Sequence, residues 1–268
     1  MKYLVLLAAL LFSTASLADQ VPPLPIEQCI TQAPYGFPQT EKQGVGICRT
    51  AYVTLNDTVA KIPVWSSYIL TPNHALGCVP RSNAFSPDTS LPKGSRAELV
   101  DYVGSGFDQG HMVPFGGMDW NAQVGRESFL LSNMVPQTPK NNRGIFKLVE
   151  TSVRGWVVQR NHPFVIYVGP IYDQTDKTIG FDKVVVPHAF YKIAIDTITK
   201  EVAGFIFPYA GITSTDITTV RAPISKIEQQ TGVKFAYPIP ATELPLTTAW
   251  PVDFGALTKA KQAACKAK

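Results

Sequence analysis

The sequence has no long apolar run of the kind that crosses a membrane. Its most apolar segment, residues 3–12, is shorter than the about 20 residues that a spanning helix needs, and no later stretch of that length lacks charge. Because Lys2 precedes this segment and Ser16-Leu17-Ala18 follows it, residues 1–18 are typical of a secretory signal peptide. The pattern predicts an exported protein, periplasmic or secreted, that begins near Asp19 and has no membrane contact after cleavage.

Closely spaced zinc ligands are also missing. Neither Cys-x-x-Cys nor His-x-x-x-His spacing occurs, which argues against a zinc hydrolase. In an exported chain the four cysteines instead predict two disulfides. Three pairings are possible and the sequence does not choose among them, although a bridge from the last cysteine would tie the C-terminal tail to the body. The four are Cys29, Cys48, Cys78 and Cys265.

No Gly/Ser linker, repeat or low-complexity tract divides the chain after the signal peptide. We therefore predict a single domain over residues 19–268, in which 19–60 form an N-terminal arm and the start of the domain and 61–268 form its body. The proline-rich residues 21–38 are expected to run as an extended arm over the surface. Nothing in the sequence indicates an oligomeric state.

Net charge is low. The 24 Lys and Arg against 20 Asp and Glu give +4, and removal of Lys2 leaves +3, which is too small to argue for nucleic-acid binding. The distribution is uneven, because basic residues gather between positions 126 and 154 with only Glu127 and Glu150 among them. This locally basic segment contains Arg126, Lys140, Arg143, Lys147 and Arg154.

The hydrophobic pattern predicts an α+β fold with a largely antiparallel central sheet flanked by helices. Clusters of β-branched and aromatic residues predict strands at 62–70, 164–169, 183–186, 190–196 and 202–207. Residues 164–168 are apolar throughout, which favours a central strand covered on both faces. Apolar residues at three- and four-residue steps predict a helix over 142–160. A second helix is predicted over 223–230, before Gly232.

The densest group of chemically useful residues is the segment 105–114, with the sequence SGFDQGHMVP. Taken alone, His111 is more simply a structural histidine, and Asp108 beside glycine is typical of a turn. Further motifs follow, however: LSNMVPQ at 131–137, NNRG at 141–144, and Glu150. No direct catalytic role is expected for the remaining histidines, His74, His162 and His188.

In this order the motifs resemble the DNA/RNA non-specific endonuclease family, the ββα-metal nucleases, which includes secreted bacterial nucleases and mitochondrial endonuclease G. The resemblance covers about residues 65–235 and also includes WSxY at 65–68, YVGP at 167–170, FYK at 190–192 and IE at 227–228. It implies a ββα-metal active-site motif and hydrolysis of DNA and RNA without sequence preference.

The resemblance also implies roles for single residues. His111 would be the general base that activates water, Asn142 the side-chain ligand of a single Mg²⁺, and Glu150 the holder of metal-bound waters. Another divalent metal such as Mn²⁺ would serve in place of Mg²⁺. Asn133 would support the site, and Arg81 matches the family's phosphate-contacting arginine less closely.

The chemistry of these side chains fits such a reaction. Phosphodiester hydrolysis needs a base for the attacking water and positive charge on the phosphate and departing oxygen. His111 can be neutral at neutral pH, and Asn142 offers a hard oxygen without negative charge. Asn142 and Glu150 lie eight residues apart, about 12 Å along an ideal helix. Both therefore cannot bind one ion directly from a straight helix: either Glu150 acts through water or the helix begins after Asn142.

One position departs from the family pattern, because Gln109 stands where arginine is usual. A neutral amide replaces only part of a charged phosphate contact, so we expect a lower rate, unless Arg143 or Arg126 compensates. Gln109 is also the best support for the main alternative, a catalytically weak or inactive nuclease-like module that binds nucleic acid or a partner protein. A second alternative is a sugar-specific phosphodiesterase on the same scaffold.

Overall fold

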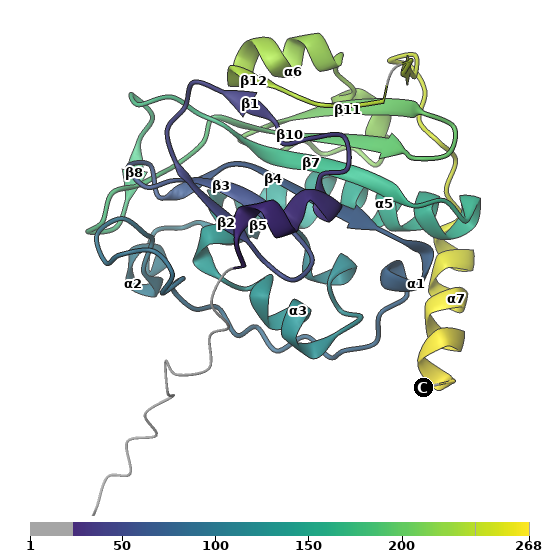
Figure 1. Cartoon of the computed structure of the whole chain (residues 1–268), viewed down its shortest axis with the longest axis horizontal. Coiled ribbons are helices and arrows are strands. Elements are labelled where there is room, and N and C mark those ends of the chain that lie inside the picture. The colour runs from purple at the N-terminus through teal and green to yellow at the C-terminus, as the bar shows by residue number, and fades with distance from the viewer. Residues whose placement is uncertain (1–23, 239, 268) are drawn as a thin grey trace, which may run out of the picture.

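The computed structural model describes residues 24–238 and 240–267, so the predicted signal peptide lies outside the described residues. A seven-stranded sheet crosses the molecule (Figure 1), and only its β11–β13 pair is parallel. This confirms the predicted α+β class with a largely antiparallel sheet. In pairing order the strands are β13 (Thr242–Glu243), β11 (Glu201–Pro208), β10 (Ala189–Asp196), β7 (Phe164–Ile171), β4 (Ile62–Leu70), β3 (Val53–Asp57) and β2 (Val45–Cys48).

Helices and short ribbons surround this sheet. Two-stranded ribbons pair β1 with β12, β5 with β6 and β8 with β9. No helix among the described residues is both long and apolar enough to span a bilayer. The helices are α1 (Pro72–Ala75), α2 (Leu99–Tyr102), α3 (Ala122–Glu127), α4 (Pro139–Asn141), α5 (Lys147–Arg160), α6 (Ile224–Thr231) and α7 (Phe254–Lys266). The ribbon strands are β1 (Gln39–Thr40), β5 (Asp108–His111), β6 (Met134–Gln137), β8 (Thr178–Ile179), β9 (Val184–Val185) and β12 (Val233–Lys234).

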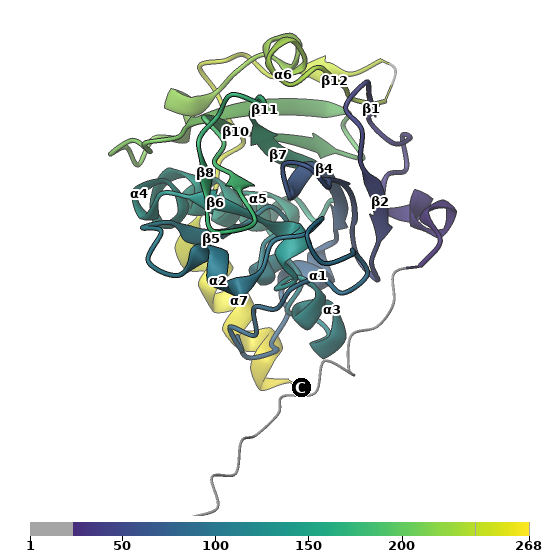
Figure 2. The same cartoon turned by 90° about the vertical axis from the view of Figure 1, so that its left-hand side faces the viewer.

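Each face of the sheet packs into its own hydrophobic cluster, because successive strand residues point to opposite sides. On β10, Phe190 and Ala194 belong to the cluster that includes α5, whereas Tyr191 and Ile193 belong to the one that includes α6. Figures 1 and 2 show α6 over one face and α5, backed by α7, over the other. Every residue of β7 is buried, which confirms the prediction of a central strand covered on both faces.

Three sequence predictions need correction. The strand predicted over 183–186 is present only as β9, Val184–Val185, which pairs with β8 outside the central sheet. The helix expected over 142–160 is broken, because Asn142–Phe146 forms a π-helical turn in which Gly144 has non-helical angles (φ −100°, ψ −119°). The arm expected to be extended contains a 3₁₀ helix, Ile26–Gln32, whose Cys29 is fully buried. The second predicted helix is present as α6, which ends at Thr231 and is capped by Gly232, whose φ is 67°.

Two disulfides are present, as the cysteine content predicts. Cys29 is bonded to Cys48, which joins the N-terminal 3₁₀ helix to β2, and Cys78 is bonded to Cys265 near the end of α7. The second bond closes a separation of 187 residues. The C-terminal helix is therefore covalently tied to the loop after α1, as expected for a bridge from Cys265.

Candidate active site

A β-ribbon followed by α5 carries the motif residues. In this ribbon Asp108 pairs with Gln137 and His111 pairs with Met134. A Cβ atom at Gly110 would lie 2.2 Å from Oε1 of Gln137, so a side chain at this position would collide with the neighbouring strand. The glycine between Asp108 and His111 thus lets the two strands approach, and the ribbon and α5 form the ββα unit that the resemblance implies.

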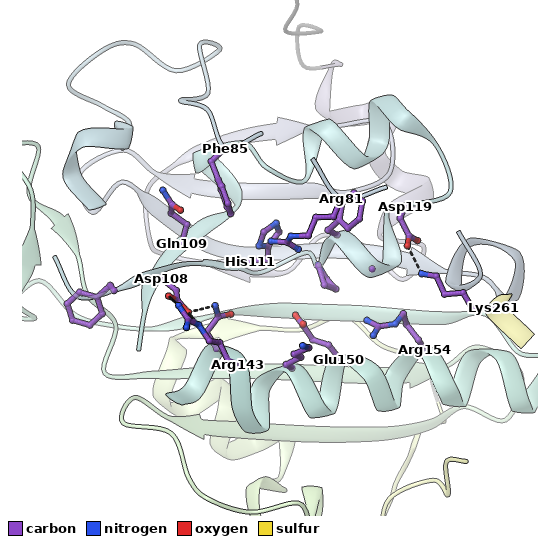
Figure 3. Close-up of a pocket in the computed structure, with 16 residues that line it drawn as sticks. Arg81, Phe85, Asp108, Gln109, His111, Asp119, Arg143, Glu150, Arg154 and Lys261 are labelled. Carbon is purple, nitrogen blue, oxygen red and sulfur yellow. Dashed lines mark hydrogen bonds and ion pairs between the residues drawn. The ribbon is translucent and has the colours of Figure 1, made fainter. Parts of the chain in front are cut away.

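The ribbon, α5 and α7 surround a cleft of about 660 Å³ (Figure 3). Five of the six predicted site residues line it, and only Asn133 does not. Cationic side chains outnumber acidic ones in its wall, which suits a polyanionic ligand. The cations are Arg81, Arg143, Lys147, Arg154 and Lys261, and the acids are Asp108, Asp119 and Glu150.

His111 lies at the end of β5 in apolar surroundings and is only 9% exposed. The rings of Phe85 and Phe129 meet its imidazole edge-on, at centroid distances of 5.6 and 5.0 Å. Burial, with a further contribution from the charge of Arg81, lowers the pKa of His111 to about 3. Its Nε2 atom has no hydrogen-bond partner within the described part of the chain. The ring is therefore neutral at neutral pH, and one nitrogen keeps a lone pair that can accept a proton.

This environment has a direct spectroscopic consequence. Because its pKa is far below the 6.5 of a free histidine, the His111 ring should not titrate between pH 8 and 5. Its Cε1–H signal, identified by its loss in His111→Gln, should stay at the neutral-ring chemical shift throughout a ¹H–¹³C NMR titration. A midpoint above pH 6 would show that the ring is hydrated or paired with an acid.

Asn142 is held by an acidic neighbour. Its Nδ2 donates to Oδ2 of Asp108 at 2.8 Å, and Arg143 donates to both oxygens of the same carboxylate at 2.9 and 2.7 Å. A carboxylate only accepts hydrogen bonds, so the NH₂ group of Asn142 must face it and Oδ1 points elsewhere. Burial raises the pKa of Asp108, but hydrogen bonds from Arg143 and Asn142 lower it below its ordinary value. Asp108 is thus a strand residue that orients Asn142 and does not form a turn.

Glu150 lies in the first turn of α5, beyond the π-helical turn. The α-helix begins at Lys147, after Asn142, so the two residues do not project from one straight helix as the eight-residue spacing alone would suggest. The break lets Asn142 and Glu150 line one cleft. Oε1 of Glu150 is buried without a hydrogen-bond partner among the described residues and lies 3.5 Å from Nζ of Lys192. Asn142 and Glu150 therefore offer the cleft hard oxygen donors, which fit Mg²⁺ or Mn²⁺.

Asn133 lies behind the cleft and is fully buried. Its Oδ1 accepts from the backbone N–H of Val113, and its Nδ2 donates to the carbonyl oxygens of Val113 and Ser128, all at 2.9 Å. Its side chain thus bonds to the backbone two residues after His111. The structure places Asn133 where it positions the end of the ribbon, out of reach of a ligand in the cleft.

Arg81 and Gln109 lie on the His111 side of the cleft (Figure 3). The guanidinium of Arg81 stacks over Phe129, 4.9 Å from the ring centroid, and its Nε donates to Asn83. Gln109 faces the same side of β5 as His111, because strand residues two apart share a face. In the described part of the chain its amide has no hydrogen-bond partner and is free to contact a ligand.

Some cleft residues were not predicted from the sequence. Lys261 reaches the cleft from α7 and forms an ion pair with Asp119, although the two are 142 residues apart. No local pattern marks this lysine, because only the position of α7 brings it to the site. Of the basic segment, Arg143, Lys147 and Arg154 line the cleft, whereas Arg126 and Lys140 do not.

The other three histidines lie outside the cleft lining. His74 stacks on Trp120, with ring centroids 4.0 Å apart. His162 bonds to Asp196 and His188 to Asp176, each at 2.8 Å. Each ring thus has a local structural partner.

Comparison with known proteins agrees with this geometry. The model of the DNA/RNA non-specific endonuclease family matches residues 31–242. The chain is 28% identical to the mitochondrial nuclease EXOG of Homo sapiens over 219 residues, 75% of this chain and 59% of that protein. It is 26% identical to the mitochondrial endonuclease G of Bos taurus over 250 residues, 83% of each. The chain spans about half to three fifths of the length of the EXOG relatives.

A solved structure shares the fold. The crystal structure of the EndoG/EndoGI complex contains a chain that matches with a TM-score of 0.72 and 26% identity, over 78% of this chain and 91% of that one. The family match covers well over half of the sequence and includes the ribbon and α5. The chain therefore belongs to the DNA/RNA non-specific endonuclease family, whose members are nucleases.

Proposed function

We propose that this protein is an exported endonuclease that uses Mg²⁺ to hydrolyse DNA and RNA without sequence preference. The observation that carries the proposal is the convergence of neutral His111, Asn142 and Glu150 on one cationic cleft. Export is supported by the signal-peptide pattern of residues 1–18 and by two disulfides, which form in oxidising compartments.

Each side chain of the cleft has a separate role in the proposed reaction. His111 takes the proton of the attacking water through the ring nitrogen that has a lone pair. Asn142 and Glu150 would hold the cation, Asn142 through Oδ1 and Glu150 through water of its hydration shell. When bound, a divalent cation supplies positive charge beside the phosphate and the departing oxygen. Arg81 and Arg154, from opposite walls of the cleft, can contact phosphate oxygens.

Two observations favour an enzyme over the alternative functions. A module that only binds nucleic acid gains nothing from a buried histidine with an unpartnered nitrogen, which costs stability. Five cations along the cleft suit a polyanion better than a single sugar phosphate.

A plasmid assay tests the proposal. The mature protein should nick supercoiled plasmid and then degrade it to a smear, and it should also degrade single-stranded DNA and RNA. EDTA should stop cleavage and excess Mg²⁺ should restore it, because the proposed reaction needs charge beside the phosphate. Full activity in EDTA would refute the metal requirement, and discrete fragments would refute the lack of sequence preference. Binding without cleavage would favour the inactive module.

Gln109→Arg should raise activity. An arginine beside His111 would add a charge-assisted hydrogen bond that strengthens as charge builds on the phosphate. The gain in kcat should be about tenfold if the contact contributes roughly 1.4 kcal/mol in the transition state alone. Rates on one oligonucleotide, at saturating Mg²⁺ and two salt concentrations, measure it.

Gln109→Lys is the matched control, since it adds charge without the forked donor. If salt abolishes the gain and kcat does not change, the substitution has only added charge near the substrate. An unchanged rate would mean that the pocket is already filled. Arg143, which lines the cleft, would then be the residue to replace, rather than Arg126, which does not.

A further inference from the structure

A lysine is buried in the centre of the sheet. Lys192 lies on β10 between β7 and β11, and its side chain is 0% exposed. Its Nζ lies 4.5 Å from the ring centroid of Phe146 and has no hydrogen-bond partner within the described residues. The nearest opposite charge is Oε1 of Glu150, at 3.5 Å. Burial lowers the pKa of Lys192, and the charge of Glu150 partly offsets that effect.

Folding alone does not call for an ion pair at this position. Lysine is almost never fully buried unless it is paired, and replacing both members of a buried ion pair by well-packed apolar residues is often neutral or stabilising, whereas removing one member leaves an uncompensated buried charge. Residues two positions away on the same face of β10, Phe190 and Ala194, are apolar. The ammonium therefore lies at a position where packing alone would favour an apolar side chain.

The side chain of Lys192 points toward the carboxylate of Glu150. It lies on the face of the sheet that packs against α5, and Glu150 projects from α5 into the cleft. One oxygen of Glu150 is buried and faces the ammonium, while the carboxylate as a whole lines the cleft. Without that ammonium, the buried oxygen would lose the cation 3.5 Å away, and the carboxylate would be free to turn.

We propose that Lys192 is a positioning residue of the active site, whose buried ammonium holds Oε1 of Glu150 so that the other carboxylate oxygen faces the metal site. This inference rests on the proposed function of Glu150. Groups behind a metal site that orient its ligands typically change metal affinity or activity by about 10- to 100-fold when removed. Lys192 acts from inside the core, and so contacts neither substrate nor metal.

The test compares Lys192→Met, Glu150→Gln and the double variant with wild type. Methionine keeps the length of the side chain and removes its charge. Phe190→Leu is the matched control, because it alters the same face of β10 without changing charge. Urea unfolding gives stability, calorimetry with MgCl₂ and no nucleic acid gives metal affinity, and cleavage of one oligonucleotide gives kcat and KM.

Lys192→Met leaves Oε1 of Glu150 buried without its cation and should therefore unfold at a lower urea concentration than wild type, whereas the double variant with Glu150→Gln, in which no buried charge is left unpaired, should recover part of that loss. Its kcat should fall about 10- to 100-fold with little change in KM, and its Mg²⁺ affinity should fall with it. In the Glu150→Gln background the same substitution should change kcat by less than about twofold, because the carboxylate that it positions is gone. Lys192→Gln keeps a neutral donor and should retain more activity than Lys192→Met.

Several outcomes would overturn the proposal. Equal losses from Lys192→Met in both backgrounds would show that Lys192 does not act through Glu150. Lower stability with unchanged kcat would show a structural role, and tighter Mg²⁺ binding would show that the ammonium competes with the metal. If wild type failed to cleave nucleic acid, the proposed function would fall, whereas calorimetry and unfolding would still decide the role of Lys192.

Discussion

His111→Ala should lower kcat by about 10²- to 10⁴-fold, the range that a positioned general base contributes. The imidazole packs edge-on against two phenyl rings, and its Nε2 makes no hydrogen bond within the described residues. Its removal leaves a cavity that lowers stability but strips no hydrogen bond from Nε2, and it should leave the Mg²⁺ affinity nearly unchanged because a base is not a metal ligand. Single-turnover cleavage and calorimetry with MgCl₂, performed on the same preparation, separate the two properties.

Asn142→Ala should behave differently. It removes the oxygen donor that Asp108 orients, so Mg²⁺ affinity and activity should fall together, and part of the activity should return at high Mg²⁺. His111→Ala should show no such recovery. If His111→Ala lost Mg²⁺ binding and Asn142→Ala kept it, the roles assigned to the two residues would be reversed.

Asp108→Asn tests how Asn142 is oriented. An amide at position 108 keeps one acceptor but loses the charge that Arg143 and Asn142 share. We expect weaker Mg²⁺ binding than in wild type but stronger than in Asn142→Ala, because Oδ1 remains but is less well held. An effect on kcat with no change in Mg²⁺ affinity would mean that Asp108 serves Arg143 and not Asn142.

The sequence predicts elements whose pattern is local. The strand at 62–70 has the bounds of β4, and the apolar run at 164–168 lies in β7 at the centre of the sheet. The ribbon that carries His111 is not predicted by a local hydrophobic pattern. Its strands β5 and β6 have only four residues each, and among the described residues they pair with one another and with no other strand. Their motif was recognisable, but their structure depends on contacts between segments more than 20 residues apart.

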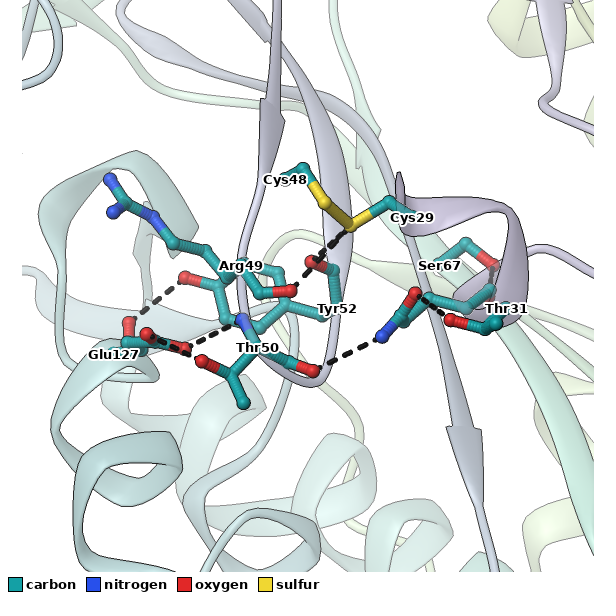
Figure 4. The surroundings of a disulfide bond; sticks show 9 residues. Cys29, Thr31, Cys48, Arg49, Thr50, Tyr52, Ser67 and Glu127 are labelled. Carbon is teal, nitrogen blue, oxygen red and sulfur yellow. Dashed lines mark hydrogen bonds between the residues drawn. A yellow bond between two sulfur atoms is a disulfide. The ribbon is translucent and has the colours of Figure 1, made fainter. Parts of the chain in front are cut away.

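The disulfide pairing also could not be predicted from local sequence patterns. Four cysteines allow three pairings, and the choice depends on where the N-terminal 3₁₀ helix packs. Figure 4 shows Cys29 beside Cys48, next to a turn whose Thr50 donates to Glu127 of α3 through its N–H and its hydroxyl. These contacts join segments from three parts of the chain, and no periodicity within one segment encodes them.

The protonation, backbone conformation and burial of the site residues were the features least predictable from the sequence. The sequence allows a neutral His111 at neutral pH, but only the packing of Phe85 and Phe129 and the approach of Arg81 lower its pKa to about 3. The helix pattern of 142–160 gave no sign of the break at Gly144, because apolar spacing continues across it. In the sequence Lys192 is only one residue of the motif FYK, and its complete burial, which gives it a role, depends on the packing of α5 against the sheet.

Asn133→Ala should lower the free energy of unfolding by at least about 3 kcal/mol, since it strips hydrogen bonds from three buried backbone groups at about 1 to 3 kcal/mol each. It should also lower kcat, because those bonds fix the backbone directly after His111. Mg²⁺ affinity should not change. Urea unfolding, calorimetry and oligonucleotide cleavage, at a temperature where the variant is folded, measure all three.

Thr231→Val is the matched control for Asn133→Ala. It removes a buried hydroxyl that donates to the carbonyl oxygen of Ile227 in α6 and accepts from the backbone N–H of Val233, on the opposite side of the sheet from the cleft. It should cost about 2 kcal/mol or more and leave kcat unchanged. A fall in kcat for Asn133→Ala without loss of stability would mean that Asn133 contacts the substrate directly. Lower stability with unchanged kcat would mean instead that His111 keeps its place without these bonds, because the rings of Phe85 and Phe129 alone hold the imidazole.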